Sequence, residues 1–369
     1  MEESPSLIVF VDAFPYSELM KAPFLNGFRY RRPLVPNIGY SVNLQAEIFT
    51  GKSPDDLGYF CDWKFDPEKS PFRSWNKILS LLTPLEFGYL PRRFVHKVLS
   101  RFRGVECKDI PMRFLPHLSP TKRDVFSMDF PGGSLFTQFG FAIIKCTDFR
   151  GELWERDVAV FEKAKEELKT RPRLVLMLGA LDGCGHWEGV GSAKWDSLIG
   201  ALDDKCRELC EVYERHYRGG TVAVLSDHGM SNVQRGHKID LSRLNGKRCK
   251  CFVDGTIIRV WSGDEDVLDD ASKYLNSVDW GSLLSEAERR DAGITNREFG
   301  DLIFIANEGE QICPSFWGAK LSKGMHGYRA SNKQMGIALL SWEPRMAPRE
   351  WAAQQVYREL RRAMGEGED

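Results

Sequence analysis

Three apolar runs in this chain each lead into an aspartate, and this repeated pattern constrains the fold more than any other feature. The runs and their aspartates are Leu7–Val11 with Asp12, Leu174–Leu181 with Asp182, and Thr221–Ser226 with Asp227. Continuous apolar runs rich in Val, Ile and Leu are typical of parallel strands that are buried on both faces. The pattern therefore predicts an α/β fold with a mainly parallel central sheet and helices on both of its faces.

The three aspartates should converge, because ligands in such sheets bind beyond the carboxyl ends of the strands. Histidines and a hydroxyl occur in similar positions: His186, His228, His326 and Ser41. One aspartate after a strand is usually a turn or helix cap, but three of them, two followed by a nearby histidine, favour a ligand set. Carboxylates and imidazoles suit Zn²⁺ or Mn²⁺, and two such ions are used in phosphoryl transfer.

Ser41 is predicted to begin a helix that follows a turn at 36–40, although the alternation of apolar residues after it also allows a strand. A serine at a helix start is commonly an N-cap, and this interpretation stays open. The positive end of the helix dipole also favours a developing alkoxide there, and a neighbouring metal ion would lower the hydroxyl pKa further. Ser41 is therefore the candidate nucleophile.

Bulk properties narrow the class of protein. The 369 residues carry a formal charge of −1, so the overall charge does not indicate a nucleic-acid partner. The nine cysteines form no regular disulfide framework, and the first apolar run starts at Leu7. No apolar stretch approaches the length of a membrane span. We therefore expect a cytoplasmic location with free thiols.

Apolar periodicity predicts helices at 157–170, at 192–217 with Ser192 as cap, and at 345–364. Residues 63–140 fit the sheet pattern poorly, and thirteen Lys/Arg against six Asp/Glu lie between Lys64 and Asp124. We predict a catalytic domain formed by 1–62 and 141–369, with 63–140 as an inserted basic, aromatic cap. The helical segment Phe94–Arg103 either packs on the main domain, binds the leaving group, or contacts an anionic membrane or lipid-linked phosphate.

The chain resembles the alkaline phosphatase superfamily, in particular its type I phosphodiesterase/nucleotide pyrophosphatase family, over residues 7–62 and about 140–345. Four motifs carry the resemblance: Leu225–Met230, Asp182-x-x-x-His186-x-x-Gly189, Met325–Tyr328, and Thr50-Gly51-x-x-Pro54. The resemblance implies two divalent ions, most simply Zn²⁺, with Mn²⁺ as the alternative. One would be held by Asp12, Ser41, Asp227 and His228, and the other by Asp182, His186 and His326. It also implies hydrolysis of a small phosphoester or nucleotide-type substrate through a phospho-Ser41 intermediate.

Two positions depart from the family pattern. The family usually has Thr as nucleophile, and it places an Asn about twenty residues later, where this chain has Asp62. An ionised Asp cannot donate a hydrogen bond to phosphate. A phosphomonoesterase of the same superfamily, or a phosphotransferase acting on a lipid- or sugar-linked acceptor, therefore stays open. The expected substrate-binding residues are Asp62, His237, Arg92 and Arg93.

Overall fold

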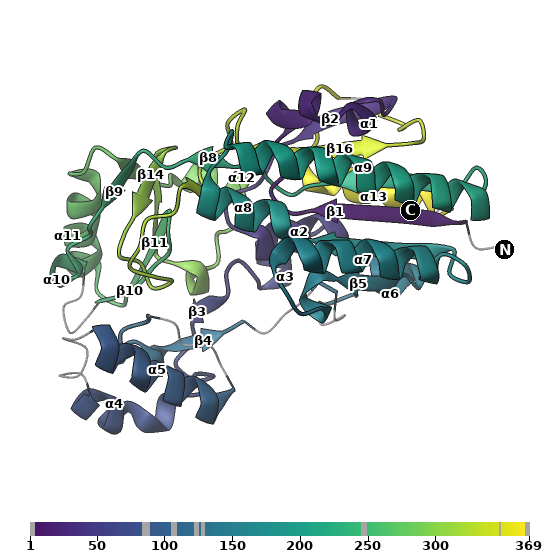
Figure 1. The fold of residues 1–369 in the computed structure, drawn as a ribbon. Helices are drawn as coiled ribbons and strands as arrows, with labels where there is room; N and C mark the ends of the chain where they lie inside the picture. The colour runs from purple at the N-terminus through teal and green to yellow at the C-terminus, as the bar shows by residue number, and fades with distance from the viewer. Residues whose placement is uncertain are drawn as a thin grey trace. The chain divides into compact units, whose positions relative to one another are not determined.

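The computed structural model of the chain describes residues 4–82, 89–104, 109–121, 125–126, 130–244, 249–346 and 348–365 (Figure 1). The chain forms two compact units. The first unit comprises Met1–Ser53, Arg123–Asn232 and Ser322–Asp369, and the second comprises Pro54–Lys122 and Val233–Leu321. The chain thus leaves the first unit twice and returns to it twice.

A six-stranded sheet forms the centre of the first unit. Its strands, in spatial order, are β2 (Tyr30–Leu34), β16 (Gly336–Leu340), β7 (Thr221–Leu225), β1 (Ser6–Val11), β6 (Arg173–Leu178) and β5 (Ala142–Lys145). Strand β1 is parallel to both β6 and β7, and β5 is parallel to β6. Strand β16 is antiparallel to β7 and β2. The predicted mainly parallel sheet is confirmed.

Helices cover both faces of this sheet (Figure 1). Alternate residues of β1, Leu7 and Val9, belong to a core shared with Val160 of α7 (Leu153–Glu167) and Trp195 of α9 (Ala193–His216). On the opposite face, Phe10 contacts Phe49 of α2 (Ser41–Thr50), with ring centroids 5.5 Å apart. Both faces of β1 are therefore buried, which explains why its sequence is apolar without interruption.

The other helices of the first unit are α1 (Pro23–Asn26), α6 (Leu135–Phe139), α8 (Ala180–Glu188) and α13 (Ala353–Ala363). Ser192 caps α9 as predicted, because its Oγ accepts a hydrogen bond from the backbone N–H of Trp195 at 3.2 Å. Helix α7 begins four residues before the predicted start at 157 and ends three residues before the predicted end at 170. Helix α13 begins eight residues after the predicted start of the terminal helix at 345 and ends one residue before its predicted end at 364.

The second unit contains a four-stranded antiparallel sheet of β10 (Cys249–Val253), β11 (Ile257–Ser262), β13 (Leu302–Ala306) and β12 (Gly281–Leu283). Two-stranded pairs are β9 (Arg235–His237) with β14 (Glu310–Ile312), and β3 (Trp63–Phe65) with β4 (Leu118–Pro120). Its helices are α3 (Pro54–Leu57), α4 (Asn76–Leu82), α5 (Tyr89–Arg103), α10 (Leu241–Leu244), α11 (Glu265–Asn276) and α12 (Glu286–Asp291).

These units differ in their bounds from the predicted domains. Most of 63–140 lies in the second unit, but so does Val233–Leu321, which the prediction assigned to the catalytic domain. The role of 63–140 as a cap stays a prediction. Among the described residues, none of the helices combines the length and the apolar character that a membrane span requires.

Candidate metal centre

Two of the three predicted aspartates lie within two residues of the ends of central strands. Asp12 comes after β1, and its backbone N–H donates to the carbonyl of Leu178, which extends the strand pairing by one residue. Asp227 comes two residues after β7 ends at Leu225. Because β1 and β7 are adjacent and parallel, their carboxyl ends lie at the same edge of the sheet. The two carboxylates therefore share one end of the first unit.

The predicted position of Asp182 at a strand end is wrong. Strand β6 ends at Leu178, Gly179 is the N-cap of α8, and Asp182 lies in the first turn of that helix. The spacing of four residues places Asp182 and His186 on the same helix face. Asp182 Oδ1 lies 3.3 Å from His186 Nε2. The apolar run could not reveal this boundary, because Ala180 and Leu181 fit a strand and a helix equally well.

Asp157 of α7 holds the beginning of α8 and was not predicted to have this role. Its Oδ1 accepts a hydrogen bond from the N–H of Gly179 at 3.1 Å, and its Oδ2 accepts one from Ala180 at 2.9 Å. Burial raises the pKa of the Asp157 carboxyl to about 6, against the hydrogen bonds from these two amides, which lower it. Asp157 thereby fixes the helix that carries Asp182 and His186.

Ser41 is the first residue of α2, as predicted. Its Oγ lies 2.9 Å from His228 Nε2 and 3.4 Å from Asp12 Oδ1. His228 Nδ1 lies 2.8 Å from the carbonyl of Gly229, which can only accept a hydrogen bond. In the neutral ring, therefore, Nδ1 carries the proton and Nε2 presents a lone pair toward Ser41 and Asp12.

His326 completes the cluster. It follows β15 (Gly324–Met325), which pairs with β8 (Ser231–Asn232). Its ring stacks on that of His228, with centroids 3.8 Å apart, and its Nε2 lies 3.6 Å from Asp182 Oδ1. The Tyr40 ring meets the His326 ring edge to face at 5.6 Å. The structure thus brings all seven residues of the predicted metal set together within the first unit.

The polar atoms of this cluster fit divalent cations. Among the described residues, two groups have ligand atoms within 4.8 Å of one another: Asp12, Asp227 and His228, and Asp182, His228 and His326. His186 Nδ1 lies 2.9 Å from the carbonyl of Gly324, so its Nε2 lone pair faces Asp182 Oδ1, as that of His228 faces Asp12. Lone pairs that face each other repel unless a proton or a cation lies between them.

The burial of several charged groups at this centre also favours bound cations. Burial raises the pKa of Asp227 to about 8, and burial together with the charge of Asp182 raises the pKa of Asp12. Burial alone would also raise the pKa of Asp182, but the contact and charge of His186 lower it. Burial lowers the pKa of His228, but the charges of Asp227 and Asp12 outweigh it and raise that pKa to about 10. Burial and the resulting charge of His228 lower the pKa of His326. The stacked imidazoles therefore cannot both be protonated readily, and bound cations would satisfy these carboxylates instead.

The predicted substrate-binding residues belong to the second unit. His237 Nε2 contacts Glu310 Oε2 at 2.5 Å, and its ring stacks on Trp280. The backbone carbonyl of Asp62 accepts a hydrogen bond from Thr121. The side chains of Arg92 and Arg93 lie outside the described part of the chain. Their roles in substrate binding stay predictions.

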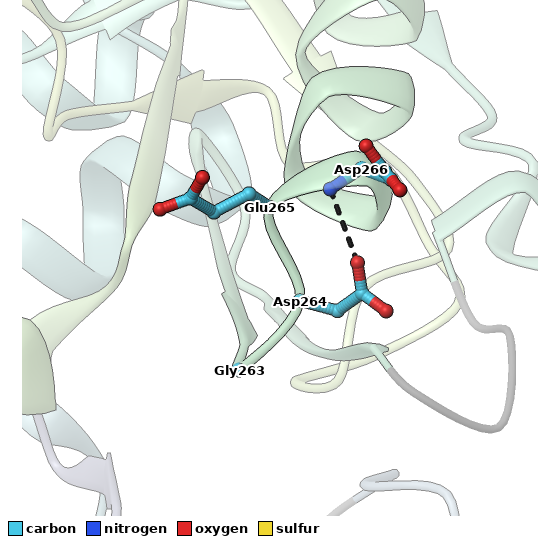
Figure 2. A pocket seen from close by; sticks show the side chains of 4 residues that line it. All are labelled: Gly263, Asp264, Glu265 and Asp266. Atoms are coloured by element: carbon cyan, nitrogen blue, oxygen red, sulfur yellow. Dashed lines mark hydrogen bonds between the residues drawn. The ribbon is translucent and has the colours of Figure 1, made fainter.

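A surface hollow of about 640 Å³ in the second unit is lined by Gly263, Asp264, Glu265 and Asp266 (Figure 2). Asp264 is the N-cap of α11, and its Oδ1 accepts a hydrogen bond from the backbone N–H of Asp266 at 3.1 Å. Helix capping accounts for this arrangement. The hollow contains none of the predicted metal ligands.

Comparison with known proteins identifies the family. Residues 46–329, more than half of the chain, match the type I phosphodiesterase/nucleotide pyrophosphatase family. The chain belongs to this family. The match includes Asp182, His186, Asp227, His228 and His326, whereas Asp12 and Ser41 precede it. No curated protein matches the chain.

Solved structures show the same fold. Murine ectonucleotide pyrophosphatase/phosphodiesterase 5, as an inactive variant in complex with AMP, is 16% identical with a TM-score of 0.65. Human ectonucleotide pyrophosphatase/phosphodiesterase 5 is 15% identical, also with a TM-score of 0.65. Each alignment covers 98% of this chain and 95% of the other chain. The predicted place in the alkaline phosphatase superfamily is confirmed.

Membership of the family supports a nucleotide pyrophosphatase/phosphodiesterase-type function, and hence a phosphoester hydrolase. Proteins of this family depend on metal ions, and the chain has Asp and His groups that could hold them. Small nucleotide or phosphoester compounds are the corresponding substrate class.

Proposed function

We propose that the protein hydrolyses phosphodiester or pyrophosphate substrates through a covalent phospho-Ser41 intermediate. The observation that supports this most strongly is the position of Ser41 Oγ, at the start of α2 and within 3.4 Å of both Asp12 and His228. A hydroxyl in this position can attack phosphorus while the helix N-terminus stabilises the negative charge on its oxygen.

Two divalent ions would occupy the cluster, and Zn²⁺ is the simplest choice because three imidazoles contribute. Asp12, Ser41, Asp227 and His228 would hold one, and Asp182, His186 and His326 the other. When bound, the ions supply positive charge that neutralises the phosphoryl oxygens and favours the ionised hydroxyl.

The proposed reaction has two steps, and Ser41 takes part in both. Ser41 Oγ forms a bond to phosphorus, and the bond from phosphorus to the leaving oxygen breaks. Water next cleaves the bond between Ser41 Oγ and phosphorus, which releases a phosphomonoester product and restores the hydroxyl. Between the two steps, Asp157 and the Gly324 carbonyl hold α8 and the His186 ring in fixed positions. Most of the catalysis would come from positioning and charge neutralisation.

The test is Ser41→Ala, assayed with bis-p-nitrophenyl phosphate, p-nitrophenyl phosphate and a nucleotide panel that includes nucleotide sugars. We expect loss of turnover with most metal retained, because six other ligands remain. The wild-type protein, quenched with acid during turnover, should carry a p-nitrophenyl phosphoryl group on Ser41 after reaction with the diester, and a phosphoryl group after reaction with p-nitrophenyl phosphate, by mass spectrometry. Full activity in the Ser41→Ala variant would contradict the covalent mechanism.

A phosphomonoesterase is the second candidate, favoured by Ser at position 41 and by the acidic Asp62. It predicts faster hydrolysis of p-nitrophenyl phosphate than of the diester. The substrate panel therefore separates the two functions.

We also propose that α5 contacts an anionic part of the substrate or its lipid carrier. Phe94 is 69% exposed, and the exposed residues Lys97 and Arg101 follow it at helical spacing. An aromatic ring beside cationic groups suits a phosphorylated or lipid-linked leaving group.

A further inference from the structure

A buried carboxylate in the middle of α2 is connected to the segment that precedes Ser41. Glu47 and Asn43 are each only 1% exposed. Glu47 Oε1 accepts a hydrogen bond from Asn43 Nδ2 at 2.9 Å, and Oε2 accepts one from Asn37 Nδ2 at 2.8 Å. A buried carboxylate is costly, so its presence here needs an explanation beyond packing.

Backbone groups fix the orientation of both amides. Asn43 Oδ1 accepts a hydrogen bond from the N–H of Tyr40 at 2.9 Å, and Asn37 Oδ1 accepts one from the N–H of Ile38 at 2.8 Å. Because the oxygens are committed to these donors, both amide nitrogens must point toward Glu47. Only a residue with two acceptor oxygens can accept hydrogen bonds from both amide nitrogens. Glutamine at position 47 has one acceptor oxygen, so its own amide nitrogen would face the amide nitrogen of Asn37 or Asn43.

The side chain of Asn43 also packs closely against the turn before Ser41. Gly39 has φ of +138°, and a Cβ added there would lie 1.9 Å from Asn43 Oδ1. Asn43 Nδ2 also donates to the carbonyl of Ile38 at 3.1 Å. The segment 37–40 is thus bound along its length by side chains of α2, and Ser41 is the next residue.

We propose that Glu47 is a positioning residue, which acts through Asn37 and Asn43 to hold the Ser41 hydroxyl at the metal centre. This inference rests on the proposed role of Ser41 as nucleophile. Glu47 acts through its hydrogen bonds to these two asparagines and not through contact with the substrate. Its function is to keep the Oγ within reach of phosphorus, where a displacement of about 1 Å can reduce the rate about 100-fold.

The test uses Glu47→Gln and the double variant Glu47→Gln/Asn37→Asp. The double variant reverses donor and acceptor, because the new carboxylate at 37 accepts from the new amide at 47 and still accepts from the N–H of Ile38. Assays run at pH 9, above the pKa of about 8 to which burial raises the Glu47 carboxyl, so that the wild-type group is ionised. We expect Glu47→Gln to lower kcat about 10- to 100-fold with KM and metal content unchanged, and the double variant to recover to within about threefold of the wild type.

Asp203→Asn is the matched control. Asp203 is also a buried carboxylate that accepts two hydrogen bonds, from the N–H groups of Phe24 at 3.0 Å and Leu25 at 2.8 Å, but it has no connection to Ser41. This variant should lose stability and keep its kcat. If Glu47→Gln does not fold, the partly exposed Asn37→Ser carries the same expectation, because it frees one oxygen of Glu47 and loosens the same segment.

Two results would overturn the proposal. One is a normal kcat in Glu47→Gln, or in Asn37→Ser, while Ser41→Ala is inactive. The other is a low kcat in Glu47→Gln that the double variant does not recover, which would indicate general destabilisation. If Ser41→Ala is itself active, the proposed function fails first, and the role of Glu47 fails with it.

Discussion

Replacing Asp157 with asparagine should change both the stability of the first unit and its affinity for metal. Asp157 is fully buried, and each of its two oxygens accepts a backbone hydrogen bond at the start of α8. Asparagine has only one acceptor oxygen, so one backbone N–H would face an amide nitrogen. A buried donor without an acceptor costs about 1–3 kcal/mol, and this loss applies at every pH.

Ionisation of the wild-type carboxyl adds a second effect that depends on pH. Burial raises its pKa from an ordinary value of 3.8 to about 6. The folded state therefore binds the proton more tightly than the unfolded state, and the wild-type protein loses stability as the pH rises from about 4 to 6. The full change is about 3 kcal/mol, of which about 2 kcal/mol falls between pH 4.5 and pH 7. Because asparagine does not ionise, the variant does not lose stability in this way as the pH rises.

We therefore expect Asp157→Asn to be less stable than the wild type at pH 4.5 and to regain about 2 kcal/mol relative to it by pH 7. Urea unfolding of both proteins at several pH values measures this difference, since the other titrating groups are common to both. At pH 7, the variant should also bind Zn²⁺ several-fold more weakly than Asp203→Asn, because α8 carries Asp182 and His186. If the free energies of unfolding of the wild type and Asp157→Asn change with pH in the same way, and the Zn²⁺ affinity is unchanged, the role that we assign to Asp157 is refuted.

Two further predictions concern the metals and the second unit. Removal of divalent ions with a chelator should lower Tm. Zn²⁺ or Mn²⁺ at about 1,000 times Kd should restore about 4 kcal/mol for each ion bound, or about 8 kcal/mol for two. Elemental analysis should find two ions per chain, and one ion or none would contradict the two-metal assignment. Neutralising Arg92, Arg93, Lys97 and Arg101 should raise KM for a diester several-fold and barely affect a small aryl phosphate, whereas equal losses on both would indicate destabilisation. The cytoplasmic location stays a prediction.

The positions of Asp12, Asp227 and Ser41 could be predicted because the signals around them are local. An apolar run fixes each strand, and the strand order brings their ends together whatever the intervening sequence contains. Asp182 was predicted to be near the others but was assigned to the wrong element. Its helix begins at a glycine, a residue that does not by itself distinguish a helix start from a turn.

The supporting residues could not be predicted, because their partners are distant or depend on the fold. Asp157 meets Gly179 across 22 residues, and in the sequence it is one acidic position in a charged helix. Glu47 lies between apolar neighbours, where periodicity would assign it to an exposed face. The antiparallel sheet of the second unit was missed as well, since its strand pairing is set by contacts between segments that are far apart in the chain.

The short ladder between β8 and β15 has a consequence for how this protein can change over evolution. Asn232 and Ser322 are the residues at which the chain leaves and re-enters the first unit, and the ladder joins Asn232 to Gly324, two residues before His326. The residues that flank the segment Val233–Leu321 are thus held beside the imidazoles. The geometry of the metal centre therefore does not depend on the length of that segment. Insertions, deletions or exchange within the intervening segment can therefore leave the positions of the proposed metal ligands unchanged.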